Sequence, residues 1–126
     1  MITQLAMIAT GATLGAWLRW GLSAWLNPRL SQLPLGTLAS NLIGGYLVGM
    51  AVAYFAANTT LAPEWRLLAI TGFLGGLTTF STFSAEVVQL LQAERLAAAA
   101  LLALLHLFGS LLLTALGFAT YRALAG

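Results

Sequence analysis

The residues most suited to chemistry lie in one short stretch from Thr71 to Ser84, which reads TGFLGGLTTFSTFS. Phe80 and Phe83 are three positions apart within it, so a helix would place both rings on one face. An aromatic ring is electropositive at its edge, so rings turned edge-on attract an anion without the strong hold of a full positive charge. Weak attraction favours conduction, because a conducted ion must leave as well as enter. The simpler interpretation is that the two rings form a packing ridge.

Three glycines precede these rings, and threonines and two serines surround them. Each glycine weakens a helix by about 1 kcal/mol relative to alanine, so the run predicts a break in the middle of an apolar segment. In a membrane the carbonyl groups freed by a break must find partners, and broken helices are therefore buried in protein or line an ion site. Freed carbonyls would suit a cation. The alternative is a packing notch, in which the hydroxyls bond to carbonyls one turn back.

Polar side chains also recur at every fourth position in two apolar segments, and residues at this spacing share a helix face. Such a stripe either lines a wet path or holds helices together through hydrogen bonds. Asn41 adds an amide, which is both donor and acceptor, to a third apolar segment. The stripes consist of Thr78, Thr82 and Glu86 in one segment and of His106, Ser110 and Thr114 in the other.

Two of these polar residues are ionisable. Glu86 is either part of an ion path, as charged residues within membranes usually are, or a group that water reaches from the nearby helix end. His106 is either a proton switch or a packing histidine whose hydrogen bonds are satisfied, and we favour the second interpretation.

The chain that must position these residues carries very little charge. It has 126 residues, of which 60% are hydrophobic and 6% are charged, whereas a soluble domain is about 25% charged. Single, scattered arginines exclude a nucleic-acid surface. The absence of cysteine and the single histidine exclude a zinc site. No nucleotide-binding, metalloprotease or serine-hydrolase motif is present, so we do not expect an enzyme. The low charge and high hydrophobic content predict an integral membrane protein.

Apolar segments of about 20 residues are long enough to cross the hydrocarbon core as helices. The uncharged runs, separated by short segments with Asn, Pro and Gly, predict an all-α fold with four membrane-spanning helices and a break in the third. A signal peptide is disfavoured, because no basic residue precedes Arg19. The expected helices lie near residues 3–25, 37–57, 65–92 and 96–123, in a single transmembrane domain of residues 1–126.

The arginines give almost no signal for orientation. With four spans, Arg66 and Arg122 lie on one side, and Arg29 and Arg95 lie on the other, with Arg19 near them. Basic residues normally accumulate on the cytoplasmic side. Either an excess of one arginine on one side is enough to fix the orientation, or the chain inserts in both orientations. Dual insertion would allow an antiparallel homodimer with its axis in the membrane plane.

Two glycine pairs, Gly11 with Gly15 and Gly45 with Gly49, have the spacing that allows membrane helices to approach closely. These pairs could pack between subunits or, at least as readily, within one. A dimer interface is the easier place for a solute pathway, because a single four-helix unit of this size has little interior.

Over nearly its full length, the chain resembles the CrcB/Fluc family of bacterial fluoride channels. The resemblance rests on GATLGAWLRW (Gly11–Trp20), GTLASNLIGGYLVG (Gly36–Gly49), GFLGGLTTFSTFS (Gly72–Ser84) and HLFGSLLLTALGF (His106–Phe118), of which the third is the most specific. It implies an antiparallel, dual-topology homodimer in the bacterial inner membrane. It also implies two fluoride pores at the subunit interface, through which fluoride leaves the cytoplasm without energy input.

The resemblance further implies roles for individual residues. The ring edges of Phe80 and Phe83 would contact fluoride, and the family's donors and hydroxyl lining correspond to Asn41, Ser110, Ser81, Thr82 and Thr114. Gly75 and Thr78 match the positions whose backbone carbonyls bind a central sodium ion, which is structural and is not transported. Arg19 matches an arginine near an aqueous vestibule, where Glu86 is a second candidate.

Two other functions compete with this interpretation. A small multidrug exporter has four helices and a similar length, but its proton-coupled mechanism needs a carboxylate early in the first helix, and residues 3–25 contain none. A structural or lysis-type membrane subunit would explain the glycine pairs but not the hydroxyl stripes.

Overall fold

The computed structural model describes residues 1–27 and 33–126, and every regular element in these ranges is a helix. The three longest are α1 (Ile2–Leu26), α2 (Leu35–Ala57) and α6 (Leu96–Ala125). Between α2 and α6 lie four shorter elements: α3 (Pro63–Arg66), the π-helix η2 (Leu67–Leu74), α4 (Gly75–Leu77) and α5 (Phe80–Gln92). The predicted all-α fold is therefore confirmed, and the predicted ends of the four helical segments are within about two residues of those observed. Arg29, one of the arginines in the orientation comparison, lies outside the described residues.

The connections follow from local chemistry. Pro63 begins α3, a position where the missing N–H has no helical partner to lose. Glu94 adopts a left-handed backbone with φ of 59° between α5 and α6. Its N–H donates to the Leu91 carbonyl at 3.0 Å, and the Arg95 N–H donates to the Leu90 carbonyl at 2.9 Å. This is a common way to end a helix, and it turns the chain sharply so that α5 and α6 form an antiparallel hairpin.

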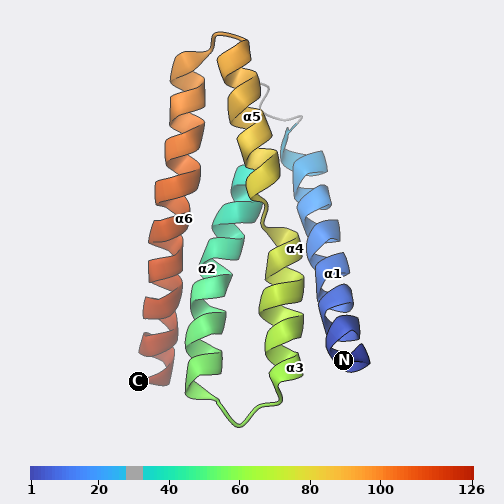
Figure 1. Cartoon of the computed structure of the whole chain (residues 1–126). Coiled ribbons are helices and arrows are strands. Elements are labelled where there is room, and N and C mark those ends of the chain that lie inside the picture. The colour runs from blue at the N-terminus through green and yellow to red at the C-terminus, as the bar shows by residue number, and fades with distance from the viewer. Residues whose placement is uncertain (28–32) are drawn as a thin grey trace.

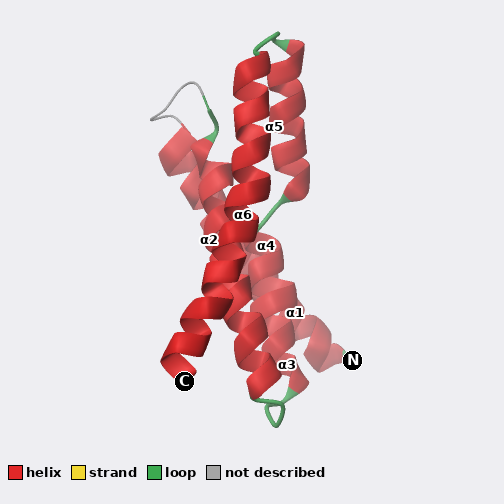
Figure 2. Cartoon of the chain, turned by 90° about the vertical axis from the view of Figure 1, so that its left-hand side faces the viewer, coloured by secondary structure: helices red, strands yellow, loops and turns green. Residues whose placement is uncertain are grey.

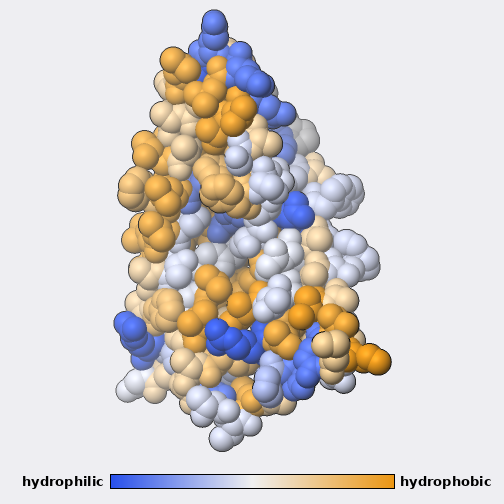
Figure 3. All heavy atoms as spheres, viewed as in Figure 1, coloured by the Kyte–Doolittle hydropathy of each residue, from blue (hydrophilic) through white to orange (hydrophobic). Residues whose placement is uncertain are grey.

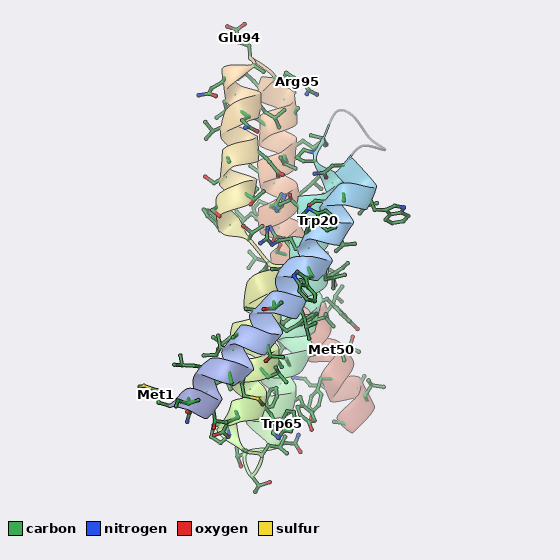
Figure 4. The ribbon with its side chains drawn as sticks, turned by 90° about the vertical axis from the view of Figure 1, so that its right-hand side faces the viewer. Met1, Trp20, Met50, Trp65, Glu94 and Arg95 are labelled. Atoms are coloured by element: carbon green, nitrogen blue, oxygen red, sulfur yellow. The ribbon has the colours of Figure 1, made fainter. Side chains whose placement is uncertain are left out.

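Both termini and the connection between α2 and α3 lie at one end of the molecule, and the turn between α5 and α6 lies at the other (Figure 1). Figure 4 shows Met1 and Trp65 at the first end and Glu94 and Arg95 at the second. The chain therefore runs up and down as the sequence predicts, with the third passage made jointly by α3, η2, α4 and α5.

The outer surface is largely apolar, as in a multi-pass membrane protein. Figure 3 shows extensive hydrophobic areas, with hydrophilic groups concentrated near the upper end and in separate patches lower down. Within residues 1–27 and 33–126, three segments are long and apolar enough to cross a membrane: Leu35–Ala57, Pro63–Gln92 and Leu96–Ala125. Helix α1 has 25 residues but is not among them, since Gln4, Arg19 and several threonines lower its hydropathy. That α1 also crosses the membrane stays a prediction.

Both glycine pairs pack within one chain, which is the second of the two alternatives that the sequence left open. A Cβ atom on Gly11 would collide with the Leu68 carbonyl oxygen, and one on Gly15 would collide with the Phe73 carbonyl oxygen, so α1 touches the backbone of η2. A Cβ atom on Gly49 would likewise collide with the carbonyl oxygen of Thr114 in α6. The glycines thus fix α1 against one side of the third passage and α2 against α6.

Candidate ion site at the broken helix

The third passage breaks at Thr78 and Thr79, whose backbones are extended, with φ and ψ of −93° and 152° and of −151° and 123°. Figure 2 shows this break as a loop at mid-height between α4 and α5. The break predicted from the glycines is therefore confirmed, although Gly75 itself stays helical and the chain unwinds just after the glycine run. The predicted stripe of Thr78, Thr82 and Glu86 is wrong as a single helix face. The extended residues separate Thr78 from α5, and only Thr82 and Glu86 share one helix.

The break diverts the donors of two backbone carbonyls. In an unbroken helix the Gly75 carbonyl would accept from the Thr79 N–H, and the Thr78 carbonyl would accept from the Thr82 N–H. Instead the Thr79 N–H donates to Asn41 Oδ1 at 2.8 Å, and the Thr82 N–H donates to Thr79 Oγ1 at 3.2 Å. The two carbonyls to which the resemblance gives a cation-binding role have therefore both lost their helical donors.

Arg19 of α1 caps the carbonyl end of the helical segment that precedes the break. Its Nε–H donates to the Gly76 carbonyl oxygen at 3.0 Å, where a continuous helix would have placed the Phe80 N–H. A cation at the carbonyl end of a helix is also favoured by the helix dipole. Arg19 is thus in contact with the break, and its predicted place at an aqueous vestibule stays a prediction.

Asn41 of α2 holds the break from the opposite side. Its Oδ1 accepts from the Thr79 N–H at 2.8 Å, and its Nδ2 donates to the Thr79 carbonyl at 3.0 Å, so that one side chain pairs with both backbone groups of Thr79. Nδ2 also lies 3.0 Å from Nδ1 of His106. Buried backbone polar groups need such partners, and Asn41 therefore allows residue 79 to leave the helix without losing its hydrogen bonds.

The aromatic residues form a connected series beside Asn41. The rings of Phe80 and Phe83 meet edge to face, with centroids 5.4 Å apart and planes at 78°. Phe83 stacks on His106, with centroids 4.1 Å apart and planes at 27°. Phe80 is 77% exposed, so this series begins in the interior at His106 and ends at the surface.

A cavity of about 480 Å³ lies between α2, the third passage and α6. Its lining brings together six predicted site residues with His106, which the sequence placed in a polar stripe, and with Thr79, whose role the sequence analysis did not foresee. The six are Asn41, Gly75, Thr78, Phe80, Phe83 and Ser110. We call this cavity the groove. Five predicted residues are not part of its lining: Arg19, Ser81, Thr82, Glu86 and Thr114.

The hydroxyl groups near the groove differ in how they are used. Thr114 Oγ1 donates to the Gly45 carbonyl at 2.9 Å and so links α6 to α2. Thr82 and Ser81 lie on α5, with their hydroxyl oxygens 3.3 and 3.4 Å from Thr79 Oγ1. The Ser110 hydroxyl makes no hydrogen bond with the described residues, which leaves it available in the groove.

A second polar contact lies one turn of α2 away from the groove. Thr37, which is 1% exposed, donates from Oγ1 to Glu86 Oε2 at 2.7 Å. Besides Gln4 Oε1, three buried side-chain atoms have no hydrogen-bond partner among residues 1–27 and 33–126: Ser40 Oγ, Glu86 Oε1 and His106 Nε2. The expectation of a packing histidine is thus correct for the ring, which is 4% exposed, but wrong in that its hydrogen bonds are not all satisfied.

Sequence reasoning missed Thr37 and the role of Thr79. Thr37 lies four residues before Asn41, and this spacing was a usable signal because it places both on one face of α2. Thr79 caps α5 by accepting from the Thr82 N–H. That role depends on the residue at which the helix breaks, which the composition of the stretch does not give.

Known proteins resemble this chain along its length. The family model described as CrcB-like protein, Camphor Resistance (CrcB), matches residues 6–118. The fluoride-specific ion channel FluC of Pseudomonas putida (strain W619) is 56% identical over 126 residues, which cover 100% of this chain and 99% of the relative. The fluoride-specific ion channel FluC of Cupriavidus taiwanensis is 63% identical over 118 residues, with 94% of each chain covered. The protein of that name from Pseudomonas aeruginosa is 61% identical over 117 residues, with 93% and 92% covered.

Proposed function

The chain belongs to the CrcB family, and we propose that it is a fluoride-specific passive channel that exports fluoride from the cytoplasm and so lowers its toxicity. The observation that carries the proposal is the sequence identity of 56% and 63% to two fluoride-specific ion channels, over 100% and 94% of this chain. The family is one of ion channels and not of enzymes. None of these relatives supports the alternative of a proton-coupled multidrug exporter.

The groove supplies a physical basis for weak anion binding. Moving a bare ion into hydrocarbon costs on the order of 20 kcal/mol before any relaxation, so a path must replace much of the lost hydration. The electropositive edges of Phe80 and Phe83 and the donors of Asn41 and Ser110 would do so beside the break. None of these groups carries a full positive charge, and the fluoride ion would therefore be released readily.

We place the remaining predicted residues along the approaches to the groove. The hydroxyls of Ser81 and Thr82 on α5 and of Thr114 on α6 would extend its polar lining. Arg19 and Glu86 would lie nearer to the aqueous vestibules, where a cation attracts fluoride and a carboxyl group limits how strongly it is held.

We propose that the functional unit is an antiparallel homodimer in the bacterial inner membrane. Asn41, Thr78 and Ser110 line the groove together with Phe80, which is 77% exposed in the single chain. Polar groups facing lipid are unfavourable, and a second copy in the opposite orientation would cover them. Two copies related in this way would enclose two pores.

We expect a structural sodium ion at the carbonyl oxygens of Gly75 and Thr78, which have lost their helical N–H donors. Carbonyl oxygens replace the hydration shell of alkali cations in other membrane proteins, and two copies of this pair would surround one ion on the dimer axis. The fixed charge would offset part of the cost of holding an anion nearby, without sodium itself being transported. Assembling the dimer with N-methylglucamine in place of sodium should impair association or abolish fluoride flux. Normal assembly and flux without sodium would contradict the metal site.

The decisive experiment for the function is fluoride efflux from liposomes that contain only this purified chain. A fluoride electrode should record rapid, electrogenic efflux when a potassium ionophore provides a counter-current, and a chloride electrode should record little loss from matched liposomes. Efflux should not require a proton gradient, which separates a channel from a proton-coupled exporter. Liposomes that retain fluoride would refute the proposal, and cross-links formed only between parallel subunits would refute the antiparallel dimer.

A further inference from the structure

Both amide hydrogens of Asn41 are already in use in this structure. One is donated to the Thr79 carbonyl at 3.0 Å, and the other faces His106 Nδ1, also at 3.0 Å. A carboxamide nitrogen carries only two hydrogens. Fluoride therefore cannot receive an N–H from Asn41 unless one of these two bonds is given up.

The contacts of Asn41 also determine the tautomer of His106. The amide cannot be turned round, because its Oδ1 must face the Thr79 N–H and its Nδ2 must face the Thr79 carbonyl. The nitrogen that faces His106 is therefore a donor, and Nδ1 of the imidazole must accept. The proton of the neutral ring then lies on Nε2, which is buried and has no partner among the described residues.

The bond to His106 is the one that can be released. The bond to Thr79 supports the break in the helix, whereas the ring of His106 also stacks on Phe83 and so does not depend on Asn41 alone for its position. Both Asn41 and His106 line the groove, so an anion there would approach the same amide hydrogen.

We propose that His106 and fluoride compete for one amide hydrogen of Asn41, which makes His106 the positioning residue that sets how tightly the groove holds fluoride. This inference rests on the proposed fluoride function. Fluoride gains a strong charge-assisted bond only by displacing a neutral acceptor, so the net gain on binding is smaller than with a free amide. Weaker net binding speeds exit from the groove.

The tautomer and the competition can be measured directly, because the chain contains a single histidine. A ¹⁵N-histidine NMR spectrum of the reconstituted wild-type channel has one pair of ring signals. We expect a protonated Nε2 and an unprotonated, hydrogen-bonded Nδ1. Adding fluoride, but not chloride, should shift the Nδ1 signal toward that of an unbonded ring nitrogen. A protonated Nδ1, or an Nδ1 signal that does not respond to fluoride in a conducting sample, would overturn the inference.

Two variants test the consequence for transport. His106→Phe keeps an aromatic ring against Phe83 but removes the acceptor, so the free amide should lower the half-saturating fluoride concentration of flux by about tenfold. His106→Gln restores an acceptor and should return the value toward that of the wild type. If His106 serves only as packing, the phenylalanine variant should behave like the wild type, and this result would overturn the inference.

The outcome remains distinguishable from a failure of the proposed function. Wild-type liposomes that retain fluoride would refute the channel function, while the tautomer in the NMR spectrum would still decide whether Nδ1 accepts from Asn41. Fluoride flux in the wild type together with a protonated Nδ1 would refute the competition alone. Should His106→Phe fail to assemble on size-exclusion chromatography, the fluoride titration of the wild-type spectrum gives the result.

Discussion

The third passage of the chain has two very different sides. Toward α1 it is in direct backbone contact, because Gly11 and Gly15 leave no room for even one carbon atom before the carbonyls of Leu68 and Phe73. Toward α2 and α6 it borders a cavity of about 480 Å³, whose lining combines the polar and aromatic side chains of the groove with aliphatic ones such as Val48, Ile70 and Leu107. The same short segment is therefore held rigidly on one side and left accessible on the other.

This difference shows how a helix can stay broken within a membrane. An isolated break would leave backbone groups without partners in an environment that contains no water. Here close packing against α1 immobilises the segment, Arg19 caps the carbonyl end, and Asn41 pairs with Thr79. With these supports in place, the break persists although the carbonyls of Gly75 and Thr78 have lost their helical donors.

The largest effect should come from removing the aromatic edges in the groove. Replacing both Phe80 and Phe83 with isoleucine removes two ring-edge contacts worth about 1 kcal/mol each, so fluoride flux should fall by roughly 30-fold. The measurement is initial efflux from liposomes with a fluoride electrode. Phe108→Ile is the matched control, because Phe108 is 60% exposed and does not line the groove. Equal flux in the double variant and the control would show that the rings only pack.

Substitutions in the close contact between α1 and the third passage should change the free energy of unfolding and not the ion selectivity. In Gly15→Ala the new methyl group meets the Phe73 carbonyl oxygen, and overpacking of this kind costs about 2 kcal/mol of unfolding free energy. Gly21→Ala is a control in the same helix, since no heavy atom lies within 4 Å of the added carbon. It should leave stability unchanged or raise it slightly, because alanine is the better helix former. Reversible unfolding in mixed micelles measures both, and equal stabilities would contradict the close contact.

The smallest effects should come from removing either of two hydroxyl groups that lie one turn apart on α6, and the two removals should differ in their effects on flux and stability. Ser110→Ala removes a hydroxyl that has no hydrogen-bond partner in the described part of the chain, so we expect flux to fall about fivefold with little change in stability. Thr114→Val removes the bond to the Gly45 carbonyl and should cost about 1 kcal/mol of stability. Its effect on flux should be smaller than that of Ser110→Ala. The reverse order of the two flux values would mean that Thr114, and not Ser110, is the more important ligand.

Much of the architecture could be predicted from the sequence, because it depends on neighbours along the chain. Low charge and long apolar runs determined a helical membrane protein, and the glycines and hydroxyls of residues 71–84 determined that the third passage would break. The motifs also identified Phe80, Phe83, Asn41 and Ser110, which the structure brings together in one groove.

Only the tertiary structure decided which hydrogen bonds these residues make. Asn41 reaches Thr79 across 38 positions of the chain, and Arg19 reaches Gly76 across 57. Periodicity along a helix cannot register such contacts, and it wrongly joined Thr78 to Thr82 and Glu86 through a segment that is extended. A polar side chain in a membrane bonds to whichever complementary group lies within about 3 Å, and that distance is set by how separate helices pack.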